Sequence, residues 1–144
     1  MLGGALALVV ASLFTGAAVY IHAAEQPARL RLNDEGLLQE WKLAYLRGYA
    51  MQAPLAVMGF VLGAWVWYRG GHIGFLVGAL CMLANWPWTL LVIRPVNSQL
   101  MAIEPNAAGS GSRALIERWN ALHLVRTVLG SLAVAAFLIG LLAD

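Results

Sequence analysis

Four long stretches of mostly apolar residues alternate with shorter polar segments along the chain, at about residues 2–24, 50–68, 73–93 and 114–143. A helix needs about 20 mostly apolar residues to cross the hydrocarbon core of a bilayer. A backbone inside lipid has to satisfy its own hydrogen bonds, and the alternating pattern of a membrane β-barrel is absent from these stretches. The pattern therefore predicts an all-α fold: an antiparallel bundle of four transmembrane helices that forms a single integral membrane domain over residues 1–144.

A further helix is predicted between the first two spans, at about residues 34–47. Asn33 is a favourable N-cap, and Asp34 and Glu35 fall in the first turn, where the helix dipole favours negative charge. The larger apolar residues that follow recur at helical spacing: Leu37, Leu38, Trp41 and Tyr45. We therefore expect an amphipathic helix that lies in the membrane interface and covers the adjacent end of the bundle.

The composition agrees with a membrane protein and excludes other classes. Hydrophobic residues make up 61% of the chain and charged residues 11%, whereas a soluble domain has about 25% charged residues. The net charge of +2 comes from scattered arginines without a basic stripe, so we expect no nucleic-acid partner. Cys81 is the only cysteine, which excludes an intrachain disulfide and a cysteine-based metal site.

The two ends of the predicted bundle differ in charge. We call one the turn end, because it carries both termini and the reversal Arg69-Gly70-Gly71-His72, and the other the loop end, because it carries the two longer connections. Eight of the nine Lys and Arg residues, all except Arg69, fall toward the loop end. Basic residues favour the cytoplasmic side of a membrane. We therefore expect a multi-pass protein of a bacterial inner (plasma) membrane, with both longer connections in the cytoplasm.

Polar residues within two of the spans fall on single helix faces. In the fourth span, one face comprises Trp119, His123, Arg126, Thr127 and Gly130. In the first span, one face comprises Ala11, Thr15, Ala18, His22 and Glu25. Ionisable groups within a membrane span are costly and mark functional sites by default. The simplest bundle turns both faces inward, so the sequence predicts a pocket near the loop end.

The third span adds Asn85, Trp86 and Pro87 near the same end. Pro87 removes a helix hydrogen bond and favours a kink that opens the bundle there. Four of the six tryptophans lie toward this end: Trp41, Trp86, Trp88 and Trp119. An interfacial aromatic belt accounts for some of them, and aromatic walls around a flat ligand are the alternative interpretation.

Three segments carry a family resemblance. They are Glu25-Gln26-Pro27-Ala28-Arg29 after the first span, Pro95-Val96-Asn97-Ser98-Gln99-Leu100 after the third, and Trp119-Asn120-x-x-His123-x-x-Arg126-Thr127 at the start of the fourth. With these segments the chain resembles, over essentially its whole length, the anthrone-oxygenase-like family of small four-span membrane proteins. The resemblance implies an oxygenase that converts an anthrone to an anthraquinone with molecular oxygen as co-substrate, and it implies no assigned metal or organic cofactor.

His123 and Arg126 are the candidate catalytic residues. A neutral imidazole at His123 is suited to take an acidic C–H or phenolic proton, and Arg126 to hold the resulting anion. For Arg126 a salt bridge to Glu25 or Glu117 is the alternative. The candidate substrate-binding residues are Trp119, Asn120, Asn97, Trp86, Asn85 and Tyr45. Capping or interhelical hydrogen bonding is the alternative for the asparagines, and an interfacial anchor is the alternative for Tyr45.

Other functions stay open at this point. His22, Glu25 and His123 form an alternative candidate metal site, and His22 with His123 could ligate haem between two histidines. The chain could also be a non-catalytic accessory subunit of a larger membrane complex, a homo-oligomer, or a carrier that binds a quinone-like lipid without chemistry. The partners expected in every case are the lipid bilayer and, for the oxygenase and the carrier, a hydrophobic small molecule.

Overall fold

The structure is a computed structural model that describes residues 2–143, so Met1 and Asp144 lie outside the described residues. Helices follow one another along the chain, and the described residues contain no strand: α1 (Leu2–Tyr20), a π turn η1 (Ile21–Glu25), α2 (Gln26–Arg29), α3 (Asp34–Tyr68), α4 (Ile73–Trp88), a second π turn η2 (Thr89–Ile93), α5 (Arg94–Ala102), a 3-10 turn η3 (Pro105–Ala107) and α6 (Ser110–Ala143). Together they form four continuous helical segments that are long and apolar enough to cross a membrane: Leu2–Arg29, Asp34–Tyr68, Ile73–Ala102 and Ser110–Ala143. The predicted all-α fold with four spans is confirmed.

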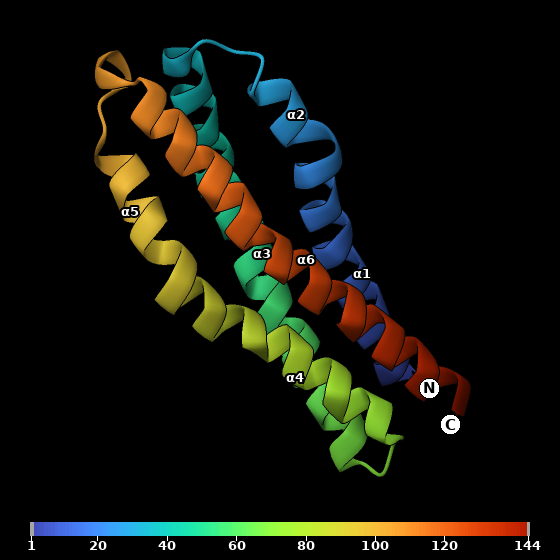
Figure 1. The fold of residues 1–144 in the computed structure, drawn as a ribbon. Helices are drawn as coiled ribbons and strands as arrows, with labels where there is room; N and C mark the ends of the chain where they lie inside the picture. The colour runs from blue at the N-terminus through green and yellow to red at the C-terminus, as the bar shows by residue number, and fades with distance from the viewer. Residues whose placement is uncertain (1, 144) are drawn as a thin grey trace.

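The four segments form an antiparallel bundle (Figure 1). α1 packs against α3 and α6, and α4 packs against the same two helices. The two ends of the chain lie near the turn between α3 and α4, while α2, α5 and the starts of α3 and α6 lie at the opposite end (Figure 1). Gly70 in that turn has a φ of 92°, a backbone conformation that residues with a Cβ rarely adopt. The predicted turn end and loop end are therefore present.

The amphipathic helix predicted at 34–47 is not a separate element, and this part of the prediction is wrong. Its N-cap is as expected, since the Asn33 side-chain oxygen accepts a hydrogen bond from the Gly36 backbone N–H at 2.9 Å. The helix then continues without a break into the span predicted at 50–68, so that α3 has 35 residues. Within α3 no proline precedes Pro54, and a glycine such as Gly48 costs a helix only about 1 kcal/mol. Nothing in the sequence therefore ends the helix at residue 47.

The core has one cluster at each end of the bundle. At the turn end, Phe75 and Phe137 stack with ring centroids 6.1 Å apart, and Gly63 and Gly78 let the Phe137 ring approach their backbones closely. At the loop end, Leu37, Leu38, Trp41, Ile93, Val96, Leu100, Ile116 and Trp119 form a second buried cluster. The turn-end half of the bundle is thus tightly filled by aromatic rings packed over glycines.

Arg113 in the first turns of α6 holds the connection between the first two spans in place. Its Nε donates to Asp34 at 2.6 Å, and its terminal nitrogens donate to the carbonyl oxygens of Leu30 and Leu32 at 3.1 and 2.7 Å. These contacts join α2, α3 and α6 at the loop end. The polar residues that follow on α6 are therefore held at a fixed position relative to α2 and α3.

Candidate functional site

A cavity of about 570 Å³ lies in the loop-end half of the bundle. Its walls come from α1, η1 and α2 on one side and from α3 on the other, with η2, α5 and α6 completing it. Cavities of this size are typical of small-molecule sites. Aliphatic and aromatic residues make up part of the lining: Ala17, Tyr20, Ile21, Leu43, Ala44, Tyr45, Tyr49, Met51, Ile93 and Trp119. The cavity is thus suited to an organic molecule with a large apolar surface.

Both π turns contribute to this cavity, through Ile21 and Glu25 of η1 and Thr89 and Ile93 of η2. Each π turn ends two residues before a proline, Pro27 or Pro95. A proline has no N–H for the carbonyl four residues earlier and its ring collides with that carbonyl. The preceding turn relieves the collision by widening into a π turn, a feature that often occurs at functional sites.

His123 lies on the cavity wall and is 2% exposed. The Trp119 ring stacks on it, with centroids 4.9 Å apart and an interplanar angle of 28°. Nδ1 of His123 lies 3.3 Å from Nε2 of His22, which comes from η1. The two polar faces predicted on the first and fourth spans therefore meet inside the bundle, near the loop end.

Arg126 lies one turn beyond His123 on the same wall and is 9% exposed. Its guanidinium lies over the Phe14 ring at 5.3 Å from the centroid. Within residues 2–143 it forms no ion pair with a carboxylate, and its Nε is buried without a hydrogen-bond partner. The alternative of a salt bridge to Glu25 or Glu117 is therefore not formed.

Arg29 engages the carboxylates at this site. Its guanidinium forms ion pairs with Glu25 and, from Nε at 2.8 Å, with Glu40 of α3. Arg29 is 3% exposed, and its guanidinium also lies 5.9 Å from the centroid of Trp119. Glu25, Arg29 and Glu40 together connect the first span to α3 across the edge of the cavity. Within the described part of the chain, Arg126 has no carboxylate partner.

Two amides on the cavity wall also lack partners. Gln52 of α3 is buried, and neither its side-chain oxygen nor its nitrogen has a hydrogen bond. The side-chain oxygen of Asn97 in α5 is buried and unpaired as well. Buried polar groups in proteins almost always have a partner. Donors and acceptors that line a cavity without one are therefore available to a ligand.

Of the six predicted substrate-binding residues, three line this cavity: Trp119, Asn97 and Tyr45. Tyr45 stacks on Trp41, with centroids 5.0 Å apart and an interplanar angle of 3°. Asn120 is half-buried on α6, and its side-chain oxygen lacks a partner. It is not part of the cavity lining. Two of the predicted aromatic residues and one of the predicted amides therefore lie on the cavity wall, where a ligand could contact them.

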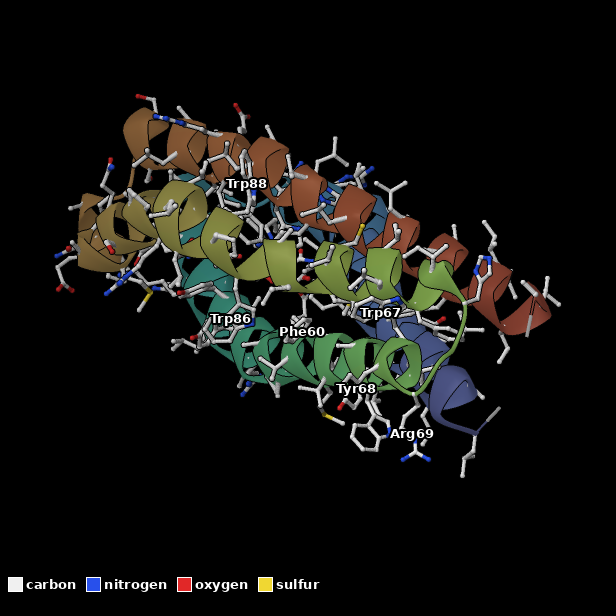
Figure 2. The ribbon with its side chains drawn as sticks, turned by 90° about the horizontal axis from the view of Figure 1, so that it is seen from below. Phe60, Trp67, Tyr68, Arg69, Trp86 and Trp88 are labelled. Atoms are coloured by element: carbon white, nitrogen blue, oxygen red, sulfur yellow. The ribbon has the colours of Figure 1, made fainter. Side chains whose placement is uncertain are left out.

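Asn85 and Trp86 lie at a different place from the one predicted. They line a second cavity of about 20 Å³ between α3 and α4, which shares Tyr49, Thr89 and Arg126 with the larger one. The Asn85 side chain donates to the carbonyl oxygens of Cys81 and Met82 in its own helix. Figure 2 shows Trp86 directed toward α3 and Trp88 toward α6, where its ring N–H donates to the Leu122 carbonyl at 3.0 Å.

The metal and haem alternatives have no matching geometry in the described part of the chain. No group of three His, Cys, Asp or Glu residues is arranged to hold a metal ion, because Glu25 turns to Arg29 instead of joining His22 and His123. The ring nitrogens of the two histidines contact one another directly at 3.3 Å. They do not face each other across the gap that an iron porphyrin needs.

Several cavity residues were not among the predicted site residues: Gln52, Arg29, Glu40, Tyr49 and Thr89. For Gln52 the sequence does hold a signal, since an amide within an otherwise apolar span is costly unless it has a function. Arg29 and Glu40 flank the spans and look like ordinary interfacial charges. Only the path of α2 and α3 brings them together.

The sequence profile of the anthrone oxygenase family matches residues 41–137. The chain belongs to this family. The matched region begins in α3 and ends in α6, so it contains Gln52, Asn97, His123 and Arg126, whereas His22, Glu25 and Arg29 precede it. The resemblance expected from the sequence is confirmed.

Curated relatives in the anthrone oxygenase family come from fungi. Anthrone oxygenase ptaC of Pestalotiopsis fici is 30% identical over 106 residues, which cover 64% of this chain and 75% of the relative. Anthrone oxygenase tpcL of Aspergillus fumigatus is 28% identical over 86% of this chain and 83% of its own length. An anthrone oxygenase of Claviceps purpurea is 29% identical over 86% and 79%. These relatives do not support the expected bacterial membrane, and no solved structure matches the chain.

Proposed function

We propose that this protein oxygenates a flat, apolar anthrone-type ketone inside the bilayer. The observation that carries the proposal is the pairing of a buried imidazole, His123, with an unpaired guanidinium, Arg126, on one wall of the 570 Å³ cavity. A base and a cation without a counter-ion are the groups that a reaction through an organic anion needs. The names of the relatives agree with this class of substrate.

The first step is removal of a proton from the methylene carbon opposite the ketone. In an anthrone this proton is acidic because its loss makes a fully aromatic phenolate. His123 takes the proton, and Arg126 holds the oxygen on which the negative charge collects. Gln52 offers a further amide N–H to the same oxygen, since its side chain lines the cavity unpaired.

The anion then supplies the electrons for molecular oxygen. One oxygen atom bonds to the former methylene carbon, which loses both of its hydrogens and becomes a second carbonyl. The other oxygen atom leaves as water with those two hydrogens, so that the atoms of anthrone and O₂ equal those of anthraquinone and water. The carbon is oxidised and O₂ is reduced, and the role of this chain is to make and hold the anion.

The substrate enters between α1 and α3. Tyr20, Leu43 and Met51 line the cavity and are themselves 61%, 61% and 49% exposed. In a bilayer, side chains at this position face lipid or its interface. An apolar ketone dissolved in the membrane therefore reaches His123 without first crossing water.

His123→Ala tests the proposal. This substitution removes the proposed base on the wall that carries Arg126, so we expect oxygen consumption with an anthrone to fall by about 10² to 10⁴-fold. The measurement is oxygen uptake and quinone absorbance with purified protein in lipid nanodiscs. His72→Asn, at the turn end, is the matched control, because asparagine can also cap the start of α4, and it should keep wild-type turnover. Unchanged turnover in His123→Ala would contradict the proposal.

A further inference from the structure

His22 contacts the back of His123 without reaching the cavity. The contact joins Nδ1 of His123 to Nε2 of His22 at 3.3 Å, and the ring centroids are 5.3 Å apart. His123 is part of the cavity lining, whereas His22 is half-buried in η1 and is not. Since Nδ1 of His123 is directed at His22, Nε2 is the ring nitrogen left for a molecule in the cavity.

The direction of this hydrogen bond decides which form of His123 faces the substrate. A neutral imidazole has one N–H and one lone pair, so one of the two rings donates and the other accepts. Two acceptors lie beside His22, the backbone carbonyl of His123 and the side-chain oxygen of Asn120, and the Asn120 oxygen is buried without another partner. Carbonyl and amide oxygens only accept, so they favour an N–H on the His22 ring. With that N–H on Nδ1, Nε2 of His22 is the acceptor, and His123 donates from its own Nδ1.

We propose that His22 is a positioning residue for the reaction proposed above, on which this inference rests. By accepting from Nδ1–H of His123, it holds His123 in the tautomer whose Nε2 lone pair faces the cavity. After His123 has taken the substrate proton, the same contact stabilises the imidazolium. The arrangement matches the base-and-orienting-group logic of catalytic triads, with a neutral acceptor in place of a carboxylate.

The histidine pair lies in a positively charged part of the site. Arg126 and Arg29 both line the cavity with His123, so an imidazolium at His123 needs an acceptor beside it. Glu25 and Glu40 are paired with Arg29 and are not hydrogen-bonded to either histidine. Among the described residues, His22 is therefore the group in direct contact that can share the charge.

Three substitutions of His22 separate positioning from packing. His22→Leu keeps the bulk and removes the acceptor. His22→Gln puts an amide oxygen near the place of Nε2, while His22→Asn reaches only the place of Nδ1. We expect kcat to fall at least about tenfold in His22→Leu and His22→Asn, and to recover in His22→Gln, because a mis-set tautomer removes much of the advantage of a general base. KM for the anthrone should stay within about twofold, since His22 does not line the cavity.

Nitrogen NMR gives a readout that a packing role would not change. The chain has 3 histidines, so ¹⁵N-histidine labelling yields few imidazole signals, and His123→Ala assigns those of His123. Nδ1 of His123 should be protonated in the wild type and in His22→Gln, and His22→Leu should show a mixture of tautomers. These spectra need no turnover and apply to any variant that stays folded in nanodiscs.

The outcomes distinguish the two proposals. Full activity in His22→Leu together with an inactive His123→Ala overturns the positioning role and leaves the proposed function intact. Lower activity in His22→Leu with unchanged His123 signals also overturns it, because the loss would then be structural. Full activity in His123→Ala overturns the proposed function and the role of His22 with it.

Discussion

Among the described residues no carboxylate pairs with Arg126, which distinguishes it from Arg29, the other buried arginine at the site. Arg29 has two, Glu25 and Glu40. A buried cation without a counter-ion is unfavourable in a membrane-embedded structure, and an arrangement of this kind persists when the charge serves a ligand. The difference between the two arginines predicts opposite effects on stability and on activity when Arg126 is replaced.

Arg126→Met should lower kcat by about 10²-fold, the usual effect of removing one group that stabilises a developing oxyanion. Its thermal stability in nanodiscs should stay level or rise, because an apolar side chain over Phe14 replaces a buried charge that has no counter-ion. Initial oxygen-uptake rates and a thermal unfolding curve on the same sample measure both effects. Arg69→Met at the exposed turn end is the control. A clear loss of stability in Arg126→Met would mean that the charge has a structural partner.

At the residue scale, the sequence shows which groups lie together only when they share one helix. The spacing of Trp119, His123 and Arg126 puts them on one face of α6, and the structure has all three on the cavity wall. Gln52 and Glu40 reach the same cavity from α3, a relation between helices that no spacing within a helix encodes. Asn85 likewise has a favourable spacing but hydrogen-bonds its own helix.

At the element scale, the spans could be predicted because lipid demands long apolar helices, whereas the path of α3 could not. Residues 34–47 have the composition of an interfacial helix, and composition does not reveal whether a helix bends into the next one. That outcome depends on Gly48, which a helix tolerates, and on the packing of Leu37, Leu38 and Trp41 against α5 and α6. In this continuous form α3 contributes one wall of the cavity.

Two glycines of the bundle should respond in opposite ways to alanine. A Cβ at Gly78 would overlap the Phe137 ring, whereas a Cβ at Gly48 meets nothing within 4 Å. Gly78→Ala should therefore destabilise the protein by about 1–3 kcal/mol, and Gly48→Ala should stabilise it by about 0.5–1 kcal/mol. Thermal unfolding in one detergent compares them directly. Equal midpoints for the two variants would show that the turn-end core is loosely packed.

At the scale of the whole molecule, the charge bias still predicts the orientation in the membrane. Of the eight basic residues toward the loop end, only Arg29 and Arg126 are buried. The remaining six lie at least partly at the surface, where they bear on topology. When the two buried arginines are left out, the basic residues still lie mostly toward the loop end. The charge bias therefore keeps its direction.

A single reporter cysteine tests this orientation. In a Cys81→Ser background, Arg69→Cys should react with a membrane-impermeant maleimide added to intact cells, because it lies at the turn end. Ser110→Cys, at the exposed start of α6 at the loop end, should react only after the membrane is permeabilised. The reverse labelling pattern would place the connections between spans outside the cytoplasm.

The opening between α1 and α3 has a consequence for how such an enzyme would encounter its substrate. For a ketone that enters laterally from the bilayer, the concentration that matters is its ratio to lipid. Once the ketone has partitioned into the membrane, the volume of the surrounding buffer no longer affects that concentration. Turnover would then slow by surface dilution whenever bilayer area grows at constant substrate, and it would quicken where a neighbouring enzyme releases the ketone into the same leaflet. The quinone would leave by the same two-dimensional route.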